Sequence, residues 1–327
     1  MPPQVTGVLY ENDEEVTGEA ILNVQKNITL QKLPIIWSIV IKHAVSHIIS
    51  FYGLYLAFTS ASWLTLLYGF VNYVVGCLGA TAGVHRLWCH RSYKARWPLR
   101  LFLAYGQTQN FHMDIIYWSR VHRVHHRYTE TDADPTNAKR GMVYAHIGWT
   151  YQEETDDFKE KFQATEVPDI EADPIAKFQQ KYYKELVILI CYVIPTVVPM
   201  YFWNESFANA LSVNFLRYSL NLHSFFFVNS IAHWLGNKPY EKSIEASENL
   251  FVSTVLLGEG WHNYHHTFPW DYRTGEMGRL NLSASFIYLM SKLGLAYDLK
   301  TVTPEMLKRR IQKSGDGSHE MWGPKSE

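Results

Sequence analysis

The stretch KHAVSHIISFYGLYLAFTS (Lys42 to Ser60) is followed, after almost no loop, by WLTLLYGFVNYVVGCLGATAG (Trp63 to Gly83). Each segment approaches the roughly 20 residues with which a helix crosses about 30 Å of hydrocarbon. The residues TSAS (Thr59 to Ser62) leave room only for a tight reversal, which favours an antiparallel helical hairpin. The sequence therefore predicts an all-α membrane protein whose first two crossings span about 42–60 and 63–83.

A second pair of apolar segments comes later, as LVILICYVIPTVVPMYFW (186–203) and SVNFLRYSLNLHSFFFVNSIAHW (212–234). The connections 59–62 and 204–211 carry no Lys or Arg. Cations instead crowd the far end of the second segment: Arg86, Arg91, Lys94, Arg96 and Arg100. Because cytoplasmic loops are rich in Lys and Arg, we expect four transmembrane helices in two hairpins, with both termini and a helical cap in the cytosol. The alternative is that these segments are core helices of a soluble all-α protein.

The composition narrows the possible classes further. The 327 residues carry a formal net charge of −1, with a pI near 7.0, so a nucleic acid partner is not expected. Three cysteines are too few and too scattered for a disulfide framework or a cysteine-based zinc site. The acidic start lacks the pattern of a cleavable signal peptide. We expect 1–30 to be a mobile tail, 31–312 a membrane-embedded domain, and 313–327 a polar C-terminal tail.

Histidines are the second unusual feature, since the chain has fifteen. The spacing HxxHH occurs twice, as HRVHH (122–126) and HNYHH (262–266). Positions i, i+3 and i+4 share one helical face, so each copy can present up to three imidazoles in one direction. His85 and His90 are five residues apart, roughly 140° around an ideal helix, and need a helix end or a bend to point together. Nine histidines, together with Asn229, are expected on the cytosolic face: His85, His90, His122, His125, His126, His233, His262, His265 and His266.

This set of imidazoles predicts a metal site. Imidazole is the commonest neutral metal ligand, and a single zinc ion uses only three or four ligands. Nine histidines therefore suggest two metal ions. HExxH is absent, and Glu-x-x-His occurs only once, at Glu259 to His262, whereas carboxylate di-iron bundles use two copies; an all-histidine di-iron site remains. The other histidines are expected in the core or on the surface, except for His112, which is undecided: His43, His47, His146, His223 and His319.

Three carboxylates lie close to these histidines in the sequence. Glu259, Asp132 and Asp134 are suited to hydrogen-bond ligating imidazoles and so to orient them. The same residue types suit helix caps and turns, especially in TDADP (131–135). The sequence leaves both roles open.

Four stretches resemble the membrane-bound acyl-CoA desaturases of the stearoyl-CoA (Δ9) type, in that family's order. They are GATAGVHRLWCHRSYKA, HRVHHRYTETDADP, NSIAHWLGNKPY and GEGWHNYHHTFPWDY. The resemblance extends from about Trp37 to Gly323. The ending KSGDGSHEMWG is similar to the insect branch, whose members include fatty-acyl and sex-pheromone desaturases.

The resemblance implies a multi-pass protein of the endoplasmic reticulum membrane, in contact with membrane lipid, that introduces a cis double bond into a saturated or monounsaturated fatty acyl-CoA. It implies two iron ions held by the nine histidines, O2 as co-substrate, and Asn229 reaching one metal through water. Electrons would come from cytochrome b5 and its NAD(P)H-dependent reductase, because the sequence shows no fused b5 domain. Removing hydrogen from unactivated methylenes needs an oxidant that only a cofactor supplies.

The resemblance also assigns contacts along the acyl chain. Trp118 matches a residue that shapes the bend in the substrate, and Tyr73 matches one that closes the far end of the tunnel. His112 and Phe225 stand where the family has Gln and Thr. Placement of the reacting carbons to within about 1 Å controls hydrogen abstraction, so the position of the double bond is not fixed by the resemblance.

The head-group contacts depart from the family more clearly. Arg120 matches a family contact to CoA. The first Trp, Trp37, is followed by Ser38-Ile39 where the family usually has Arg-Asn, and the pair Glu153-Glu154 follows Trp149 where the family commonly has Arg-Lys. Two anions in place of two cations weaken the binding of a phosphate-bearing head group.

These departures keep other functions open. An acyl-lipid desaturase, a hydroxylase or an acetylenase would use the same di-iron scaffold. A non-catalytic paralogue is a further alternative, although all nine histidines and Asn229 are intact.

Overall fold

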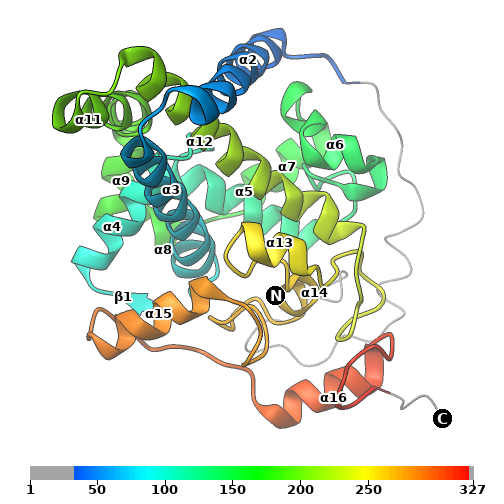
Figure 1. Ribbon diagram of the computed structural model, residues 1–327. Helices are drawn as coiled ribbons and strands as arrows, with labels where there is room; N and C mark the ends of the chain where they lie inside the picture. The colour runs from blue at the N-terminus through cyan, green and yellow to red at the C-terminus, as the bar shows by residue number, and fades with distance from the viewer. Residues whose placement is uncertain (1–32, 324–327) are drawn as a thin grey trace.

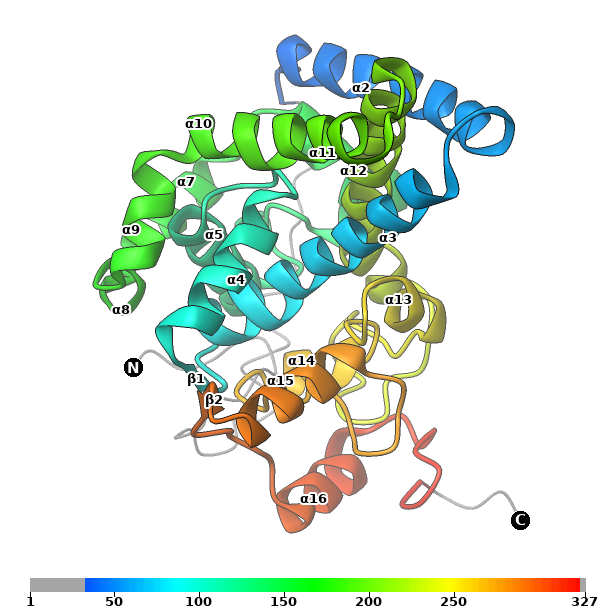
Figure 2. The ribbon, with the colours of Figure 1, turned by 60° about the vertical axis from the view of Figure 1, so that its left-hand side comes forward.

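The computed structural model describes residues 33–323, and helices make up most of that range (Figure 1). The helices α2 (Trp37–Thr59) and α11 (Ile194–Trp203) lie at one end of the molecule. At the opposite end lie α15 (Leu282–Lys292) and α16 (Pro304–Ser314) (Figures 1 and 2). The predicted helical character is confirmed. The expected N-terminal tail, 1–30, falls outside the described residues.

Three helices in the described part of the chain are long and apolar enough to cross a membrane: Trp37–Thr59, Trp63–Cys89 and Tyr183–Trp203. The second joins α3 (Trp63–Leu78) to a π-helix, η1 (Gly79–Cys89). The third joins α10 (Tyr183–Val187), a π-helix η4 (Ile188–Val193) and α11. The first helix begins earlier than the predicted 42, and the second ends later than the predicted 83.

The fourth expected crossing differs from its prediction. The corresponding helix, α12 (Phe207–Asn229), has 23 residues, as many as α2, but it is not among the helices apolar enough to span a membrane. It begins before the predicted 212 and ends before the predicted 234. Buried polar residues explain the difference, because they face the neighbouring helices α2, α3 and α11: Asn209, Ser212, Asn214, Arg217, Ser219, Asn221 and Ser224. A fourth crossing therefore stays a proposal.

The two short connections between the long helices lie side by side. Glu205 follows α11, and its carboxylate accepts hydrogen bonds from the Ser62 backbone amide at 2.8 Å and the Thr65 hydroxyl at 2.6 Å. Ser62 caps α3, and Ser206 caps α12. The contact places both turns at the same end of the long helices, as expected for two hairpins that reverse on one side.

Helices α2 and α12 cross with their backbones in contact at Gly53. A Cβ atom at Gly53 would lie 2.1 Å from the carbonyl oxygen of Ser212. Beside this point the Ser50 hydroxyl lies 2.8 Å from the Phe215 carbonyl oxygen and 2.7 Å from the Ser219 hydroxyl. Small and hydroxyl-bearing residues are typical of close helix contacts within membranes.

The π-helix η4 supplies a hydrogen-bond acceptor for a buried arginine. Arg217 of α12 is 3% exposed. Its guanidinium donates to the carbonyl oxygens of Cys191, in η4, at 3.2 Å and of Gln109 at 3.0 Å. Asn214 donates to the same Cys191 carbonyl at 2.8 Å. A π-bulge interrupts the usual i→i−4 bonding of a helix, and here one of its carbonyls accepts two side-chain bonds from α12.

The cap, which we define as residues 90–182 and 230–323, is built from short elements. Its first part comprises β1 (Lys94–Ala95), α4 (Trp97–Thr108), α5 (Ile115–Tyr128), η2 (Ala138–Arg140), α6 (Met142–His146), η3 (Gly148–Tyr151), α7 (Asp156–Ala164), α8 (Pro168–Glu171) and α9 (Pro174–Lys181). Its second part comprises η5 (Ile231–His233), α13 (Leu250–Val255), α14 (His262–Thr267), α15, β2 (Ala296–Tyr297) and α16. Strands β1 and β2 pair antiparallel, with Lys94 opposite Tyr297, and so join the two parts.

Three of the histidines expected in the core form a hydrogen-bonded chain. The His223 ring on α12 lies 2.8 Å from the His47 Nε2 on α2 and 2.9 Å from the His146 Nε2 on α6. His146 Nδ1 is in turn 3.0 Å from the Ser230 hydroxyl. Because His223 uses both ring nitrogens on opposite partners, the imidazoles do not converge on one point. They connect two long helices to the cap.

The end of the described chain packs on the cap. His319 Nε2 lies 2.7 Å from the Glu276 carboxylate. The Lys242 amide donates to the Ser314 carbonyl at 2.8 Å, and the Asp316 amide donates to the Lys238 carbonyl at 3.1 Å. Of the expected polar tail, residues 313–323 are described and 324–327 are not.

Candidate metal centre

A π-helix brings His85 and His90 together. Helix η1 continues α3 directly, and the His90 amide bonds to the His85 carbonyl five residues back, at 3.1 Å. The wider π turn carries i and i+5 to one face, whereas an α-helix would separate them by about 140°. The two ring centroids are 4.9 Å apart. The expected bend is therefore a change of helix type.

The other histidines come from α5, α14 and η5. Asp114 caps α5 by accepting hydrogen bonds from the Ile116 and Tyr117 amides. The end of α12 turns at Ser230 into η5, which directs His233 towards His262 of α14, with the two Nε2 atoms 3.0 Å apart.

The nine imidazoles form two groups, and within each group the candidate ligand atoms lie within 4.8 Å of one another. The first contains His85, His90, His122, His126 and His265, and the second contains His125, His233, His262 and His266. Each HxxHH copy is thus divided between the groups. The expectation that one copy points in one direction is wrong in this respect, because consecutive residues of a helix point about 100° apart.

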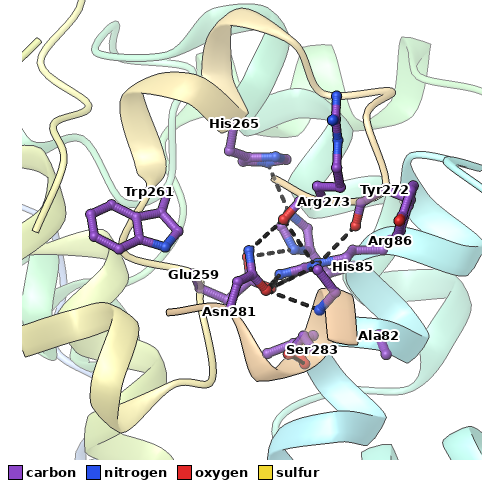
Figure 3. A network of polar contacts seen from close by, with 12 residues as sticks. Ala82, His85, Arg86, Glu259, Trp261, His265, Tyr272, Arg273, Asn281 and Ser283 are labelled. Carbon is purple, nitrogen blue, oxygen red and sulfur yellow. Dashed lines mark hydrogen bonds and ion pairs between the residues drawn. The ribbon is translucent and has the colours of Figure 1, made fainter. Parts of the chain in front are cut away.

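A buried carboxylate holds the first group in place (Figure 3). Glu259 accepts from His85 Nδ1 at 2.9 Å and from the Arg86 guanidinium at 2.8 Å. Arg86 is fully buried and also donates to the Tyr272 carbonyl at 2.9 Å and to Asn281, as Figure 3 shows. Burial by itself would raise the pKa of Glu259, but the adjacent Arg86 and His85 lower that pKa to about 2. The carboxylate is therefore ionised and fixes the His85 tautomer with Nε2 free for a metal.

Asp134 acts in the same way on the second group. Its carboxylate lies 2.8 Å from His125 Nδ1 and also accepts from the Glu130 amide at 2.9 Å and the Thr136 amide at 3.0 Å. The two roles left open by the sequence thus coexist in Asp134. The Asp132 carbonyl accepts from the Thr155 hydroxyl at 2.7 Å, and an orienting role for the Asp132 carboxylate stays a prediction.

The donor set fits metal ions. Ligands about 2.1 Å from one metal and at right angles to each other are about 3 Å apart. The Nε2 atoms of His85 and His265 are 2.9 Å apart, and those of His90 and His122 are 3.1 Å apart. Burial and the neighbouring imidazoles keep the pKa of His122 and of His265 well below the ordinary value. These rings are therefore neutral, which is the form that binds a metal.

An apolar pocket of about 530 Å³ leads to the two groups. Trp118 lies in its wall and stacks on His122, with centroids 4.6 Å apart. His112 and Phe225 face each other in the same wall at 4.4 Å. Other lining residues are Trp149 and Asn229, together with Glu153, Glu154 and Lys159. The predicted contacts Trp118, His112, Phe225 and Trp149 therefore share one cavity with the histidines.

Two predicted substrate contacts lie elsewhere. Tyr73 is not among the residues that line this pocket, and its hydroxyl bonds to Ser224 at 2.9 Å and to the Val255 carbonyl. Arg120 is ion-paired with Glu171 at 2.8 Å, and its guanidinium lies over the Phe162 ring. Contact of either residue with a substrate stays a prediction.

Residues 61–275 match the model of the fatty acid desaturase family. The chain belongs to this family. It is 46% identical over 328 residues to an acyl-CoA Delta-9 desaturase of Acheta domesticus, and the alignment spans 97% of this chain and 91% of the relative. An acyl-CoA Delta12-desaturase of the same insect is 47% identical, with 97% of this chain and 91% of the relative covered. An acyl-CoA Delta(11) desaturase of Spodoptera littoralis is 43% identical, with 98% and 94% covered.

For this member of the desaturase family, the sequence missed part of the support for the site. Arg86 appeared only as a cation at a helix end, yet it is fully buried and holds Glu259. Asn281 was not singled out, yet it is 8% exposed, caps α15, and lies beside Arg86. Asn281 reaches the site only in the folded chain, since 195 positions separate it from Arg86. The direct attachment of Arg86 to His85 was the one available signal.

Proposed function

We propose that the chain is an O2-dependent acyl-CoA desaturase with a di-iron centre. The observation that carries the proposal is the division of nine buried or partly buried imidazoles into groups of five and four at the end of an apolar pocket. Family membership and the acyl-CoA desaturases among the relatives support it. Imidazole ligands suit iron among other transition metals, and the two groups match two ions.

The proposed assignment gives each side chain a role. One iron would be held by the five-histidine group, and the other by the four-histidine group with Asn229 reaching it through water. Bound there, the irons supply the oxidation of unactivated carbon by O2, with electrons from cytochrome b5 and its NAD(P)H-dependent reductase. Glu259 and Asp134 keep two ligands in fixed tautomers.

The pocket walls position the acyl chain. Trp118, stacked on His122, places an apolar surface directly beside one group of imidazoles, and Phe225 packs edge-on against His112 in the same cavity wall. The apolar lining excludes water, so a methylene rather than solvent occupies the space next to the metals. The position of the double bond follows from this placement. Relatives named for Δ9, Δ11 and Δ12 positions are similarly close to this chain.

The charged residues that line the pocket affect which head group the substrate can carry. Glu153 and Glu154 line the pocket, and the Glu154 carboxylate accepts from the Tyr117 hydroxyl at 2.9 Å. Lys42 and Lys159 are the lysines that line the pocket and are available to a CoA phosphate there, Lys159 being ion-paired with Asp156, while Arg120 lies outside the lining and is paired with Glu171. An acyl-lipid substrate is the alternative that these carboxylates favour. Comparing acyl-CoA with acyl-phospholipid as substrates of the purified enzyme decides between them.

The location proposed is the endoplasmic reticulum membrane, with both termini in the cytosol and four crossings, α12 being the fourth. The adjoining connections at Ser62 and Glu205 support a common side for both hairpin turns. The cation-rich end of η1 supports a cytosolic cap.

Expression in a desaturase-deficient yeast tests the proposal. The expected result is new monounsaturated fatty acids in the wild type and none in His262→Ala, because that change removes one imidazole of the four-histidine group. An unchanged lipid profile with wild-type protein, iron and cytochrome b5 all present would overturn the proposal. Equal product from the variant would overturn the role of the histidines.

A further inference from the structure

In the part of the chain that the structure describes, two imidazoles of the pocket have no hydrogen-bonding partner on the ring. His43 on α2 and His112, between α4 and α5, both line the pocket. Within residues 33–323, no protein group forms a hydrogen bond with a ring nitrogen of either side chain, and His43 Nδ1 and His112 Nε2 are completely buried. His43 is only 4% exposed. Buried polar groups in folded proteins are nearly always hydrogen-bonded, so these two rings need a partner that enters the pocket.

The contrast with the neighbouring histidines is sharp. His47, one turn after His43 on α2, is bonded through both nitrogens, to His43 O at 2.5 Å and to His223 at 2.8 Å. His146 is bonded through both nitrogens as well. Among these four histidines, all outside the two metal groups, the lack of partners within residues 33–323 falls on the two that line the cavity, His43 and His112.

The surroundings of the two rings exclude most ligands. The wall around them is mostly apolar and aromatic: Phe111, Tyr218, Leu222, Phe225 and Phe226. Its one cation near His43 is Lys42, whose ammonium lies over the Phe111 ring at 4.8 Å. Burial, and then the nearness of His43 and Lys42, lower the pKa of His112 to about 3, so this ring is neutral. A neutral imidazole offers one donor and one acceptor. A neutral oxygen group that both donates and accepts, namely a hydroxyl, is its natural complement.

We propose that His43 and His112 recognise a hydroxyl group on the acyl chain, so that the preferred substrate is a hydroxylated fatty acyl thioester. This inference rests on the proposed function, because it assumes that the pocket holds an acyl chain. A site built to bond a substrate hydroxyl discriminates strongly against the analogue that lacks it, since the buried polar groups are then left unpaired. Octadecanoyl chains leave the two rings unpaired, and a hydroxyoctadecanoyl chain of the right isomer does not.

Binding measurements without turnover test the inference. Isothermal titration of the purified full-length protein compares octadecanoyl-CoA with a positional series of hydroxyoctadecanoyl-CoA isomers. At least one isomer is expected to bind about tenfold more tightly, which corresponds to about 1.4 kcal/mol. In the double variant His43→Leu/His112→Leu, the ratio of the dissociation constant of octadecanoyl-CoA to that of the preferred isomer is expected to fall to about one. A ratio measured on the same folded protein is independent of any loss of folded material.

Two results would overturn the inference. If every isomer binds no better than octadecanoyl-CoA, the rings are satisfied by water or by the thioester arm that all substrates share. If the preference survives in the double variant, other residues provide it. Failure of the proposed function is distinguishable, because it appears as absence of new double bonds in the yeast assay, whereas this inference is decided by binding alone.

Discussion

At the residue scale, each group of imidazoles depends on one carboxylate. Glu259 holds His85 and is itself held by Arg86, while Asp134 holds His125. Ligand-orienting partners of this kind affect metal affinity by about 10–100-fold. A mutation of Glu259 should therefore weaken metal binding by the five-histidine group alone, and a mutation of Asp134 should weaken metal binding by the four-histidine group alone.

Glu259→Gln tests the support of the five-histidine group. Glutamine keeps the size of the side chain but removes the negative charge that faces His85 and Arg86. We expect the affinity for one of the two irons to fall by about 10–100-fold. Metal analysis after competition with a chelator measures this loss. Glu160→Gln, at an exposed pair with Lys161, is the matched control and should retain wild-type iron. Equal retention by both variants would show that Glu259 does not support a metal ligand.

Asp134→Asn tests the four-histidine group in the same assay. The change leaves the hydrogen bonds from the Glu130 and Thr136 amides possible but weakens the bond to His125 Nδ1. We expect a partial loss of iron of similar size. Asp156→Asn, on the exposed face of α7, is the matched control and should lose no iron. If the iron losses of Asp134→Asn and Glu259→Gln fail to add in the double variant, the two groups do not bind separate ions.

The residues show which parts of the site a sequence reveals. Six of the nine histidines were found from the HxxHH spacing, and His85, His90 and His233 from their places at the cytosolic ends of the expected crossings. Their division into five and four was not, since it depends on the directions of neighbouring side chains such as His125 and His126. Arg86 and Asn281 were missed because their contacts join segments far apart in the chain.

At the element scale, helix type and helix contact decide the geometry. The apolar stretches and their tight turns were predictable from composition and length. The π-helices were not, although they place His85 and His90 together and expose Cys191 O to Arg217. The polar side of α12 was underestimated, because a polar residue inside a helix bundle and one in water look alike in a sequence.

The crossing of α2 and α12 gives a test at this scale. Gly53→Ala would place a Cβ against the Ser212 carbonyl, so the helices must separate, whereas Gly69→Ala meets only a Val213 methyl at 3.5 Å. Overpacking costs about 1–3 kcal/mol. We expect a lower midpoint of thermal unfolding in detergent for Gly53→Ala and little change for Gly69→Ala. Equal midpoints would mean that the two helices are not in backbone contact.

At the scale of the whole molecule, topology is open to a direct test. Asn204 is exposed in the connection that follows α11, whereas Asn281 is buried against Arg86. A glycosylation-acceptor insert after Asn204, long enough to clear the membrane, is expected to gain glycan in microsomes. The same insert after Gly315 in the cap should remain unmodified. Glycan on the cap insert, with none after Asn204, would reverse the orientation proposed from the cations near η1.

The most direct measurement of the central claim is the iron content of the purified full-length protein. If the two groups of imidazoles are a di-iron centre, the protein binds about two irons per chain, and His262→Ala, which disrupts only the four-histidine group, retains about one. A single iron in the wild type, or zinc in preference to iron when both are supplied, would contradict the account.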